Sequence, residues 1–194
     1  MEKNKIIDCK VVIIGGSAGS LQALLQILPF IEPPTSFAMV IVVHRKNSDE
    51  QTLEDLIALK AKIKLREVED KTPLEKGYIY IAPSNYHLLF EKNETLSLDT
   101  SEKVNYSRPS IDVSFESAAE IYGSALIGIL LSGSNTDGTA GLKAIQKASG
   151  MIIVQNPLSA DMPFMPKNAM LNTNPDLVLT PQEILEFLKE INKA

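Results

Sequence analysis

Residues 11–20 read VVIIGGSAGS, an apolar, β-branched run that ends in Gly-x-Ser-x-Gly. Leucines at helical spacing follow it, at positions 21, 24, 25 and 28. The pattern predicts a buried strand that turns sharply into a helix, with Ser17 at the turn. A serine in that position stands beside the free N–H groups of a helix N-terminus, which suits a nucleophile in acyl transfer. Two other interpretations stay open here: a glycine-rich turn that holds phosphate, and a serine that only caps the helix.

The composition is that of a globular protein. The chain has 194 residues, of which 44% are hydrophobic and 22% charged. We expect a single domain over residues 1–194, with residues 1–9 as an N-terminal tail. The net charge of −5 argues against nucleic acid or an anionic membrane surface as the main partner. With Cys9, His44 and His87 as the whole supply of cysteine and histidine, an internal disulfide is excluded and a metal site is not expected.

No apolar run reaches membrane-spanning length, and the polar start of the chain lacks the pattern of a signal peptide. We therefore expect a cytoplasmic protein without direct membrane insertion.

Short apolar segments alternate with amphipathic ones along the rest of the chain. This alternation predicts an α/β fold, with a doubly wound, mainly parallel sheet and helices on both faces. Paired segments at 87–90 and 95–98 add an antiparallel hairpin, and residues 156–166, with three prolines, are expected to form a long irregular connection. Strands are expected at residues 10–14, 38–43, 62–68, 78–82, 125–131 and 151–154, and helices at residues 21–28, 51–59, 110–122, 139–147 and 181–193.

Three polar residues stand at or just after the carboxyl ends of separate predicted strands. Ser17 follows the first strand, His44 ends the second, and Asp137 follows the strand at 125–131. In an open parallel sheet these ends converge on one edge. Taken singly, His44 is typical of a hydrogen-bonded loop residue and Asp137 of a turn former. Together with Gly-x-Ser-x-Gly they favour a nucleophile, a base and an orienting acid.

The competing interpretation is dinucleotide binding. The turn does not match Gly-x-Gly-x-x-Gly, because Ser17 occupies the position of the second glycine. The acidic residue that would bind a ribose at the end of the second strand is replaced by His44, Arg45 and Lys46. Since Arg45 and Lys46 suit a phosphorylated ribose, a nucleotide-binding protein stays as the weaker alternative.

Several segments together carry a family resemblance. They read IGGSAGS at 14–20, VVH at 42–44, KGYIYIAP at 76–83, HL at 87–88, SRPSID at 107–112, LSG at 131–133, DGTAGL at 137–142, QNP at 155–157 and MP at 165–166. From residue 11 to about residue 178 the chain resembles the catalytic domain of the CheB-type chemotaxis protein-glutamate methylesterases.

The resemblance implies a role for each matching residue. Ser17 would attack the γ-methyl ester of a receptor glutamate, His44 would act as general base and acid, and Asp137 would orient the imidazole. Backbone amides near His44 and Ser134 would hold the oxyanion, in a pocket with Ala18 and Gly133. Methylated cytoplasmic helices of chemoreceptors are the implied partner and deamidation of receptor glutamines a second activity, and no metal or organic cofactor is implied.

Two further residues are candidates for substrate binding, each with an alternative. Arg108 would contact the acidic receptor surface or form an ion pair with Asp112. Met165, with Met162, would form an apolar lip for a helical substrate or simply fill space.

The chain also departs from the family pattern. Ala18 stands where the family often has threonine, and Ser134-Asn135-Thr136 replaces a methionine-containing turn. These changes keep open a docking module that binds receptors without turnover. The family's receiver domain has no counterpart, so we expect either a fragment or a stand-alone esterase regulated in another way, such as by a receiver domain in trans.

Overall fold

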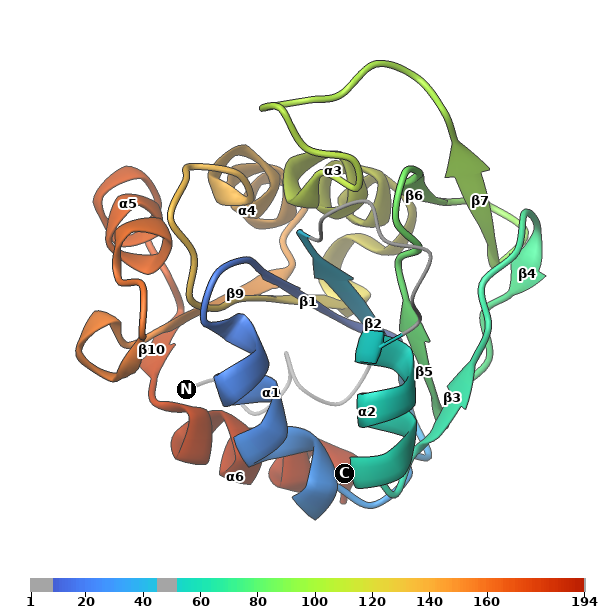
Figure 1. Cartoon of the computed structure of the whole chain (residues 1–194), viewed down its shortest axis with the longest axis horizontal. Helices are drawn as coiled ribbons and strands as arrows, with labels where there is room; N and C mark the ends of the chain where they lie inside the picture. Colours follow the sequence, from blue (N-terminus) through green and yellow to red (C-terminus); the bar gives the residue numbers. More distant parts are fainter. Residues whose placement is uncertain (1–8, 45–51, 194) are drawn as a thin grey trace.

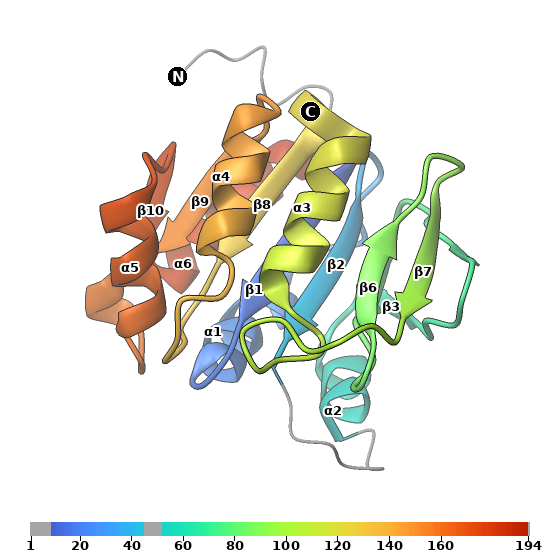
Figure 2. The ribbon, with the colours of Figure 1, turned by 90° about the horizontal axis from the view of Figure 1, so that it is seen from above.

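A seven-stranded parallel sheet forms the centre of the protein, as the computed structural model shows for residues 9–44 and 52–193. The strand β1 (Val11–Gly16) lies in the middle of the sheet and pairs in parallel with β2 (Ala38–Val43) on one side and β8 (Leu126–Leu130) on the other (Figures 1 and 2). The predicted α/β fold class is thus confirmed. In order across the sheet the strands are β10 (Leu177–Leu179), β9 (Met151–Gln155), β8 (Leu126–Leu130), β1 (Val11–Gly16), β2 (Ala38–Val43), β5 (Tyr78–Ile81) and β3 (Lys64–Arg66).

Helices cover both faces of this sheet. Side chains alternate along β1, so that Val12 and Ile14 enter one apolar core and Val11 and Ile13 the other. The first core is closed by α1 (Ser20–Ile27), α2 (Thr52–Lys60) and α6 (Pro181–Asn192). The second is closed by α3 (Ile111–Tyr122), α4 (Thr139–Lys147) and α5 (Phe164–Asn172), with α3 and α4 side by side (Figure 2). Short 3₁₀ turns, η2 (Leu28–Phe30), η3 (Gly123–Ala125) and η4 (Pro157–Ser159), complete the helical elements of the described residues.

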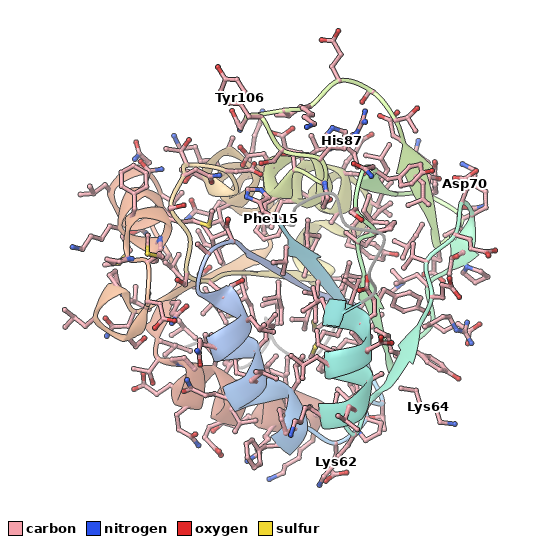
Figure 3. All side chains as sticks on the ribbon, viewed as in Figure 1. Lys62, Lys64, Asp70, His87, Tyr106 and Phe115 are labelled. Atoms are coloured by element: carbon pink, nitrogen blue, oxygen red, sulfur yellow. The ribbon has the colours of Figure 1, made fainter. Side chains whose placement is uncertain are left out.

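Helix α3 has the boundaries that its end signals predict, and it packs tightly on β1. Ser110 is its N-cap, with Oγ accepting the N–H of Val113 at 3.4 Å, and Gly123 follows its last residue. A Cβ at Gly15 would lie 2.5 Å from Cγ2 of Ile111, so only glycine on β1 lets the helix approach this closely. Phe115 from α3 is buried against the sheet (Figure 3). This packing fixes the N-terminus of α3 near the carboxyl ends of the central strands.

A small antiparallel sheet flanks the main one. The predicted hairpin forms β6 (His87–Phe90) and β7 (Thr95–Asp99), and β4 (Thr72–Pro73) adds a third strand beside β7 (Figure 1). The two-residue β4, which contains a proline, is too short to leave a periodic signal in the sequence.

Other expectations were wrong in their extent. The strand expected at 62–68 is limited to Lys64–Arg66, because only these residues pair with β5. The irregular connection expected at 156–166 contains η4, and α5 begins at Phe164 within it. Pro166 is compatible with the first helical turn because its missing N–H would have no intrahelical partner there. Neither α5 nor β10 was predicted from the sequence.

Parts of two expected elements lie outside the described residues: Gln51 at the start of the predicted second helix, and residues 1–8 of the predicted tail. Over the residues that are described, no helix combines the length and apolar character needed to cross a membrane.

Candidate active site

The carboxyl ends of three adjacent central strands bring the three predicted residues together. Ser17 follows β1, His44 follows β2, and Asp137 lies in the loop after β8. The distance from Ser17 Oγ to His44 Nδ1 is 3.2 Å, and His44 Nε2 lies 2.7 Å from Asp137 Oδ2. The chain crosses from one half of the sheet to the other at β1, and such a switch point is where open α/β sheets place their sites.

The turn that carries Ser17 is held through its backbone. The N–H of Ser17 donates to the carbonyl of Ser132 at 2.9 Å. Its carbonyl accepts from Ser20 twice, from the N–H at 3.0 Å and from Oγ at 2.7 Å. Ser17 is half-buried and Ala18 is exposed. The main chain of the serine is thus fixed while its hydroxyl faces His44 at the surface.

Asp137 is completely buried at the N-terminus of α3. Its Oδ1 accepts from Ser110 Oγ at 3.0 Å and from the N–H groups of Asp112 at 2.9 Å and Gly138 at 3.1 Å. Its Oδ2 accepts from the N–H of Ile111 at 2.7 Å as well as from His44. Burial opposes the charge, but the hydrogen bonds from His44 and from the amides of Asp112 and Ile111 prevail and lower the pKa of Asp137 to about 2. The carboxylate is therefore ionised at neutral pH.

The ionised carboxylate determines which nitrogen of His44 carries the proton. Asp137 Oδ2 can only accept, so Nε2 of His44 donates, and in the neutral ring Nδ1 keeps its lone pair. That lone pair points to the hydroxyl of Ser17. The main-chain N–H of His44 also donates to the carbonyl of Gly16 at 3.2 Å, which ties the end of β2 to β1. The arrangement can remove a proton from Ser17 and hold the resulting imidazolium.

A second buried carboxylate, Asp112, lies behind Asp137. Its Oδ1 accepts the N–H of Gly141 at 2.7 Å, and its Oδ2 accepts from the amide of Asn105 at 3.2 Å. Burial raises the pKa of Asp112 to about 6, and the nearby charge of Asp137 adds to the rise. The two neighbouring carboxylates thus have pKa values shifted in opposite directions.

The predicted pocket residues are placed differently from one another. Gly133 is buried, and its N–H already donates to the carbonyl of Met162 at 3.0 Å, so this amide is not free to bind an oxyanion. Met165 is fully buried and packs against Gly133 in the aspartate loop. Because its side chain does not reach the surface, it does not form the apolar lip expected for a helical substrate. Ser134 and Ala18 are both exposed.

Arg108 lies near His44 in the loop before α3. Its Nη1 donates to the carbonyls of Thr100 at 2.6 Å and Ser101 at 2.7 Å. The ion pair between Arg108 and Asp112 that the sequence left open is not formed, and Asp112 instead accepts from Gly141 and Asn105. Arg108 and His44 line a small pocket of about 90 Å³, together with Lys103 and Tyr106. Tyr106 projects from this loop into solvent (Figure 3). Arg45 and Lys46, on which the alternative of binding a phosphorylated ribose depended, lie outside the described residues.

Three residues that support the site had no role in it assigned from the sequence. Ser132 is fully buried, and its Oγ donates to the carbonyl of Ala18 at 2.8 Å, which joins the serine turn to the aspartate loop. Ser110 was predicted only as a helix cap, yet it also donates to Asp137. Asn135 accepts the N–H of Asp137 at 3.1 Å and approaches His44. Apart from the bond between Asn135 and Asp137, these contacts join segments far apart in the chain, so periodicity and local motifs do not show them.

His87 is a structural residue. It is fully buried, its Nε2 lies 3.0 Å from the carbonyl of Glu102, and its Nδ1 accepts the N–H of Ser110 at 3.2 Å. Both nitrogens are thus occupied, and the ring braces the loop that leads into α3 (Figure 3).

Comparisons with known proteins agree on one family. The family model described as CheB methylesterase matches residues 12–188. A Leptospira interrogans protein named "Putative protein-glutamate methylesterase/protein-glutamine glutaminase" is 41% identical over 190 residues, which are 96% of this chain and 97% of that protein. A Thermotoga maritima protein named protein-glutamate methylesterase/protein-glutamine glutaminase is 31% identical over 95% of this chain, but this spans only 55% of that protein.

A solved structure matches as well. The crystal structure of the Thermotoga maritima CheB methylesterase catalytic domain superposes with a TM-score of 0.89 at 30% sequence identity, covering 94% of this chain and 98% of that one. Almost the whole chain therefore corresponds to the catalytic domain of that protein.

Proposed function

This chain belongs to the CheB methylesterase family, and we propose that it hydrolyses glutamate γ-methyl esters of chemoreceptor proteins with Ser17 as nucleophile. The observation that carries the proposal is the continuous chain of contacts from Ser17 Oγ through both nitrogens of His44 to the buried Asp137. A nucleophile, a base and an orienting acid in this order are the parts that acyl transfer requires.

Acylation begins at Ser17. As its oxygen attacks the ester carbonyl, its proton passes to Nδ1 of His44, and a bond forms between Oγ and the carbonyl carbon. The positive charge on the ring is stabilised by Asp137, which stays ionised because of its low pKa. The tetrahedral intermediate then collapses: the bond to the methoxy oxygen breaks, and His44 returns the proton to this oxygen to release methanol.

Deacylation repeats the sequence with water. Nδ1 of His44 takes a proton from a water molecule, whose oxygen attacks the acyl carbon. The bond to Ser17 breaks, the proton returns to Oγ, and a free glutamate side chain leaves. A glutamine side chain at the same carbon would release ammonia in place of methanol, so deamidation needs no further group and is proposed as a second activity.

The proposed partner is the methylated cytoplasmic helix of a chemoreceptor, which places the reaction in the cytoplasm. Arg108 and Lys103 support this assignment, because they bring positive charge to the pocket beside His44. Receptor surfaces that carry glutamates would be attracted to such a wall.

The direct test is methanol release from a methylated receptor fragment. We expect Ser17→Ala to abolish release, while Ser124→Ala, an exposed serine at the opposite end of β8, keeps the wild-type rate. Mass spectrometry with a fluorophosphonate should add one covalent label at Ser17 and none in Ser17→Ala. A wild-type protein that binds the fragment but releases no methanol would instead be the docking module.

A further inference from the structure

Asn135 places a side-chain amide at the reacting end of the site. It lies two residues before Asp137 in the loop after β8 and is half-buried. Its Nδ2 is 3.4 Å from Nδ1 of His44, the atom that also faces Ser17 Oγ at 3.2 Å. The amide therefore shares the space in which Ser17 meets its base.

The orientation of this amide follows from its other contact. The main-chain N–H of Asp137 points to the side chain of Asn135 at 3.1 Å, and an N–H can only donate. The acceptor must be Oδ1, so the atom directed at His44 is the donor Nδ2. Because the hydrogen bond to Asp137 fixes the plane of the amide, the donor is held in place before substrate binds.

The partner of this donor changes during the reaction. In the resting site Nδ1 of His44 has one lone pair, which both Ser17 Oγ and Asn135 Nδ2 approach. Once the ring has taken the proton of Ser17, Nδ1 carries a hydrogen and no longer accepts. The Nδ2 donor then faces a cation and needs another acceptor, and the tetrahedral intermediate brings one, the oxyanion on the carbon bonded to Ser17.

We infer that Asn135 is a further catalytic residue that donates Nδ2–H to the oxyanion of the tetrahedral intermediate. This inference rests on the proposed function. In nucleophile turns of this kind, the N–H of the residue after the nucleophile, here Ala18, is one donor to the oxyanion. Asn135 would supply a second donor from the opposite loop, where the amide of Gly133 is already engaged. An interaction that is stronger in the transition state than in the ground state raises kcat and leaves substrate binding unchanged.

The test compares Asn135→Ala and Asn135→Asp in the full chain. Loss of one oxyanion donor typically lowers kcat by about 10²–10³-fold. We expect Asn135→Ala to show a loss of this size on a peptide glutamyl γ-methyl ester, with KM changed less than about threefold. Asn135→Asp keeps an oxygen for the N–H of Asp137 and so preserves the loop, but it replaces the donor by an anion and should lose at least as much. Full activity of Asn135→Asp would overturn the inference, because it would mean that Asn135 only holds the loop.

A second measurement does not depend on turnover. An alkyl boronic acid forms a tetrahedral adduct with the serine oxygen and places a hydroxyl at the oxyanion position. We expect its affinity to fall in Asn135→Ala by about the same factor as kcat, and Ser17→Ala to lose binding altogether. Asn93→Ala, at the exposed hairpin turn, is the matched amide control and should change neither value.

The two readouts separate the two hypotheses. If the wild type fails to cleave the ester while Asn135→Ala still weakens the boronate, the substrate is wrong and the oxyanion donor stands. If the wild type cleaves the ester and Asn135→Ala retains both kcat and boronate affinity within about threefold, the donor role is refuted and the proposed function stands.

Discussion

The two loops that supply the ends of the site are built in different ways. Asp137 is fully buried and accepts four hydrogen bonds from Ser110, Ile111, Asp112 and Gly138 before His44 is counted. Ser17 is half-buried, and the bonds that hold its turn all involve its backbone. The orienting end is therefore rigid and complete without substrate, whereas the hydroxyl at the nucleophilic end is free to react. Substitution of Asp137 should therefore damage both fold and catalysis, whereas substitution of the exposed Ala18 beside the nucleophile should act mildly.

After the nucleophile itself, the largest effect is expected at the rigid end. Asp137→Asn places an NH₂ group among donors that need an acceptor, and it reverses the preference of His44 for a proton on Nε2. We expect kcat to fall by about 10⁴-fold and the free energy of unfolding to fall by about 3 kcal/mol. Steady-state methanol release and urea unfolding measure the two quantities. If stability dropped and kcat did not, the carboxylate would be a structural anchor only.

A matched pair of glycine substitutions compares the packing beneath the two loops. A Cβ at Gly16 would lie 2.5 Å from Cβ of Ser20, which is fixed at the start of α1. A Cβ at Gly133 would lie 2.5 Å from Cε and Sδ of Met165, the far end of a flexible side chain, and 3.0 Å from its Cβ. We therefore expect Gly16→Ala to cost about 3 kcal/mol and Gly133→Ala about 1 kcal/mol of unfolding free energy. Equal losses in thermal or urea unfolding would show that methionine cannot yield at this position.

The sequence alone predicted much of this framework, and the reasons are local. The β-branched runs of β1 and β2 and the cap residues Ser110 and Gly123 carry their own signals, so the central strands and α3 were placed correctly. The convergence of Ser17, His44 and Asp137 also followed, because parallel strands share one edge.

What the sequence did not predict depends on contacts between distant segments. Met165 was expected at the surface because it stands in a proline-rich segment, but helix α5 forms there and buries its side chain against Gly133. Asn135 was noted only as part of a turn that departs from the family pattern, because its importance arises from the position of His44, 91 residues earlier in the chain. Side chains that act through such contacts become visible only in the folded structure.

The two buried carboxylates should respond to pH in opposite directions. The pKa of Asp112 is raised from 3.8 to about 6, so its contribution to stability is complete below about pH 4 and lost as pH rises through 6. Because asparagine does not titrate, Asp112→Asn removes this pH-dependent loss of stability. We expect the stability of the variant relative to wild type to increase by roughly 1–2 kcal/mol between pH 4 and pH 7.

The control is the carboxylate with the opposite shift. The pKa of Asp137 is lowered from 3.8 to about 2, so its contribution is present above pH 4 and lost as pH falls toward 2. Urea unfolding of wild type, Asp112→Asn and Asp137→Asn at a series of pH values gives the comparison. A flat difference between Asp112→Asn and wild type from pH 4 to 7 would mean that Asp112 does not titrate in that range.

The smallest effect is expected at Ala18, on the open side of the serine turn. Its side chain is exposed, and its tie to the aspartate loop is made by its carbonyl, which accepts from Ser132 Oγ. Ala18→Thr keeps this backbone bond and adds a hydroxyl beside Ser17, so stability should change by less than about 0.5 kcal/mol. We expect kcat/KM for a methylated receptor fragment to rise or fall by less than about tenfold, which is less than about 1.4 kcal/mol in the barrier. Ala18→Val matches the shape of threonine without its hydroxyl, so a gain in Ala18→Thr alone would reveal a hydrogen bond to the substrate. A change of a hundredfold or more would show that the open side of the turn controls catalysis as strongly as the buried aspartate does.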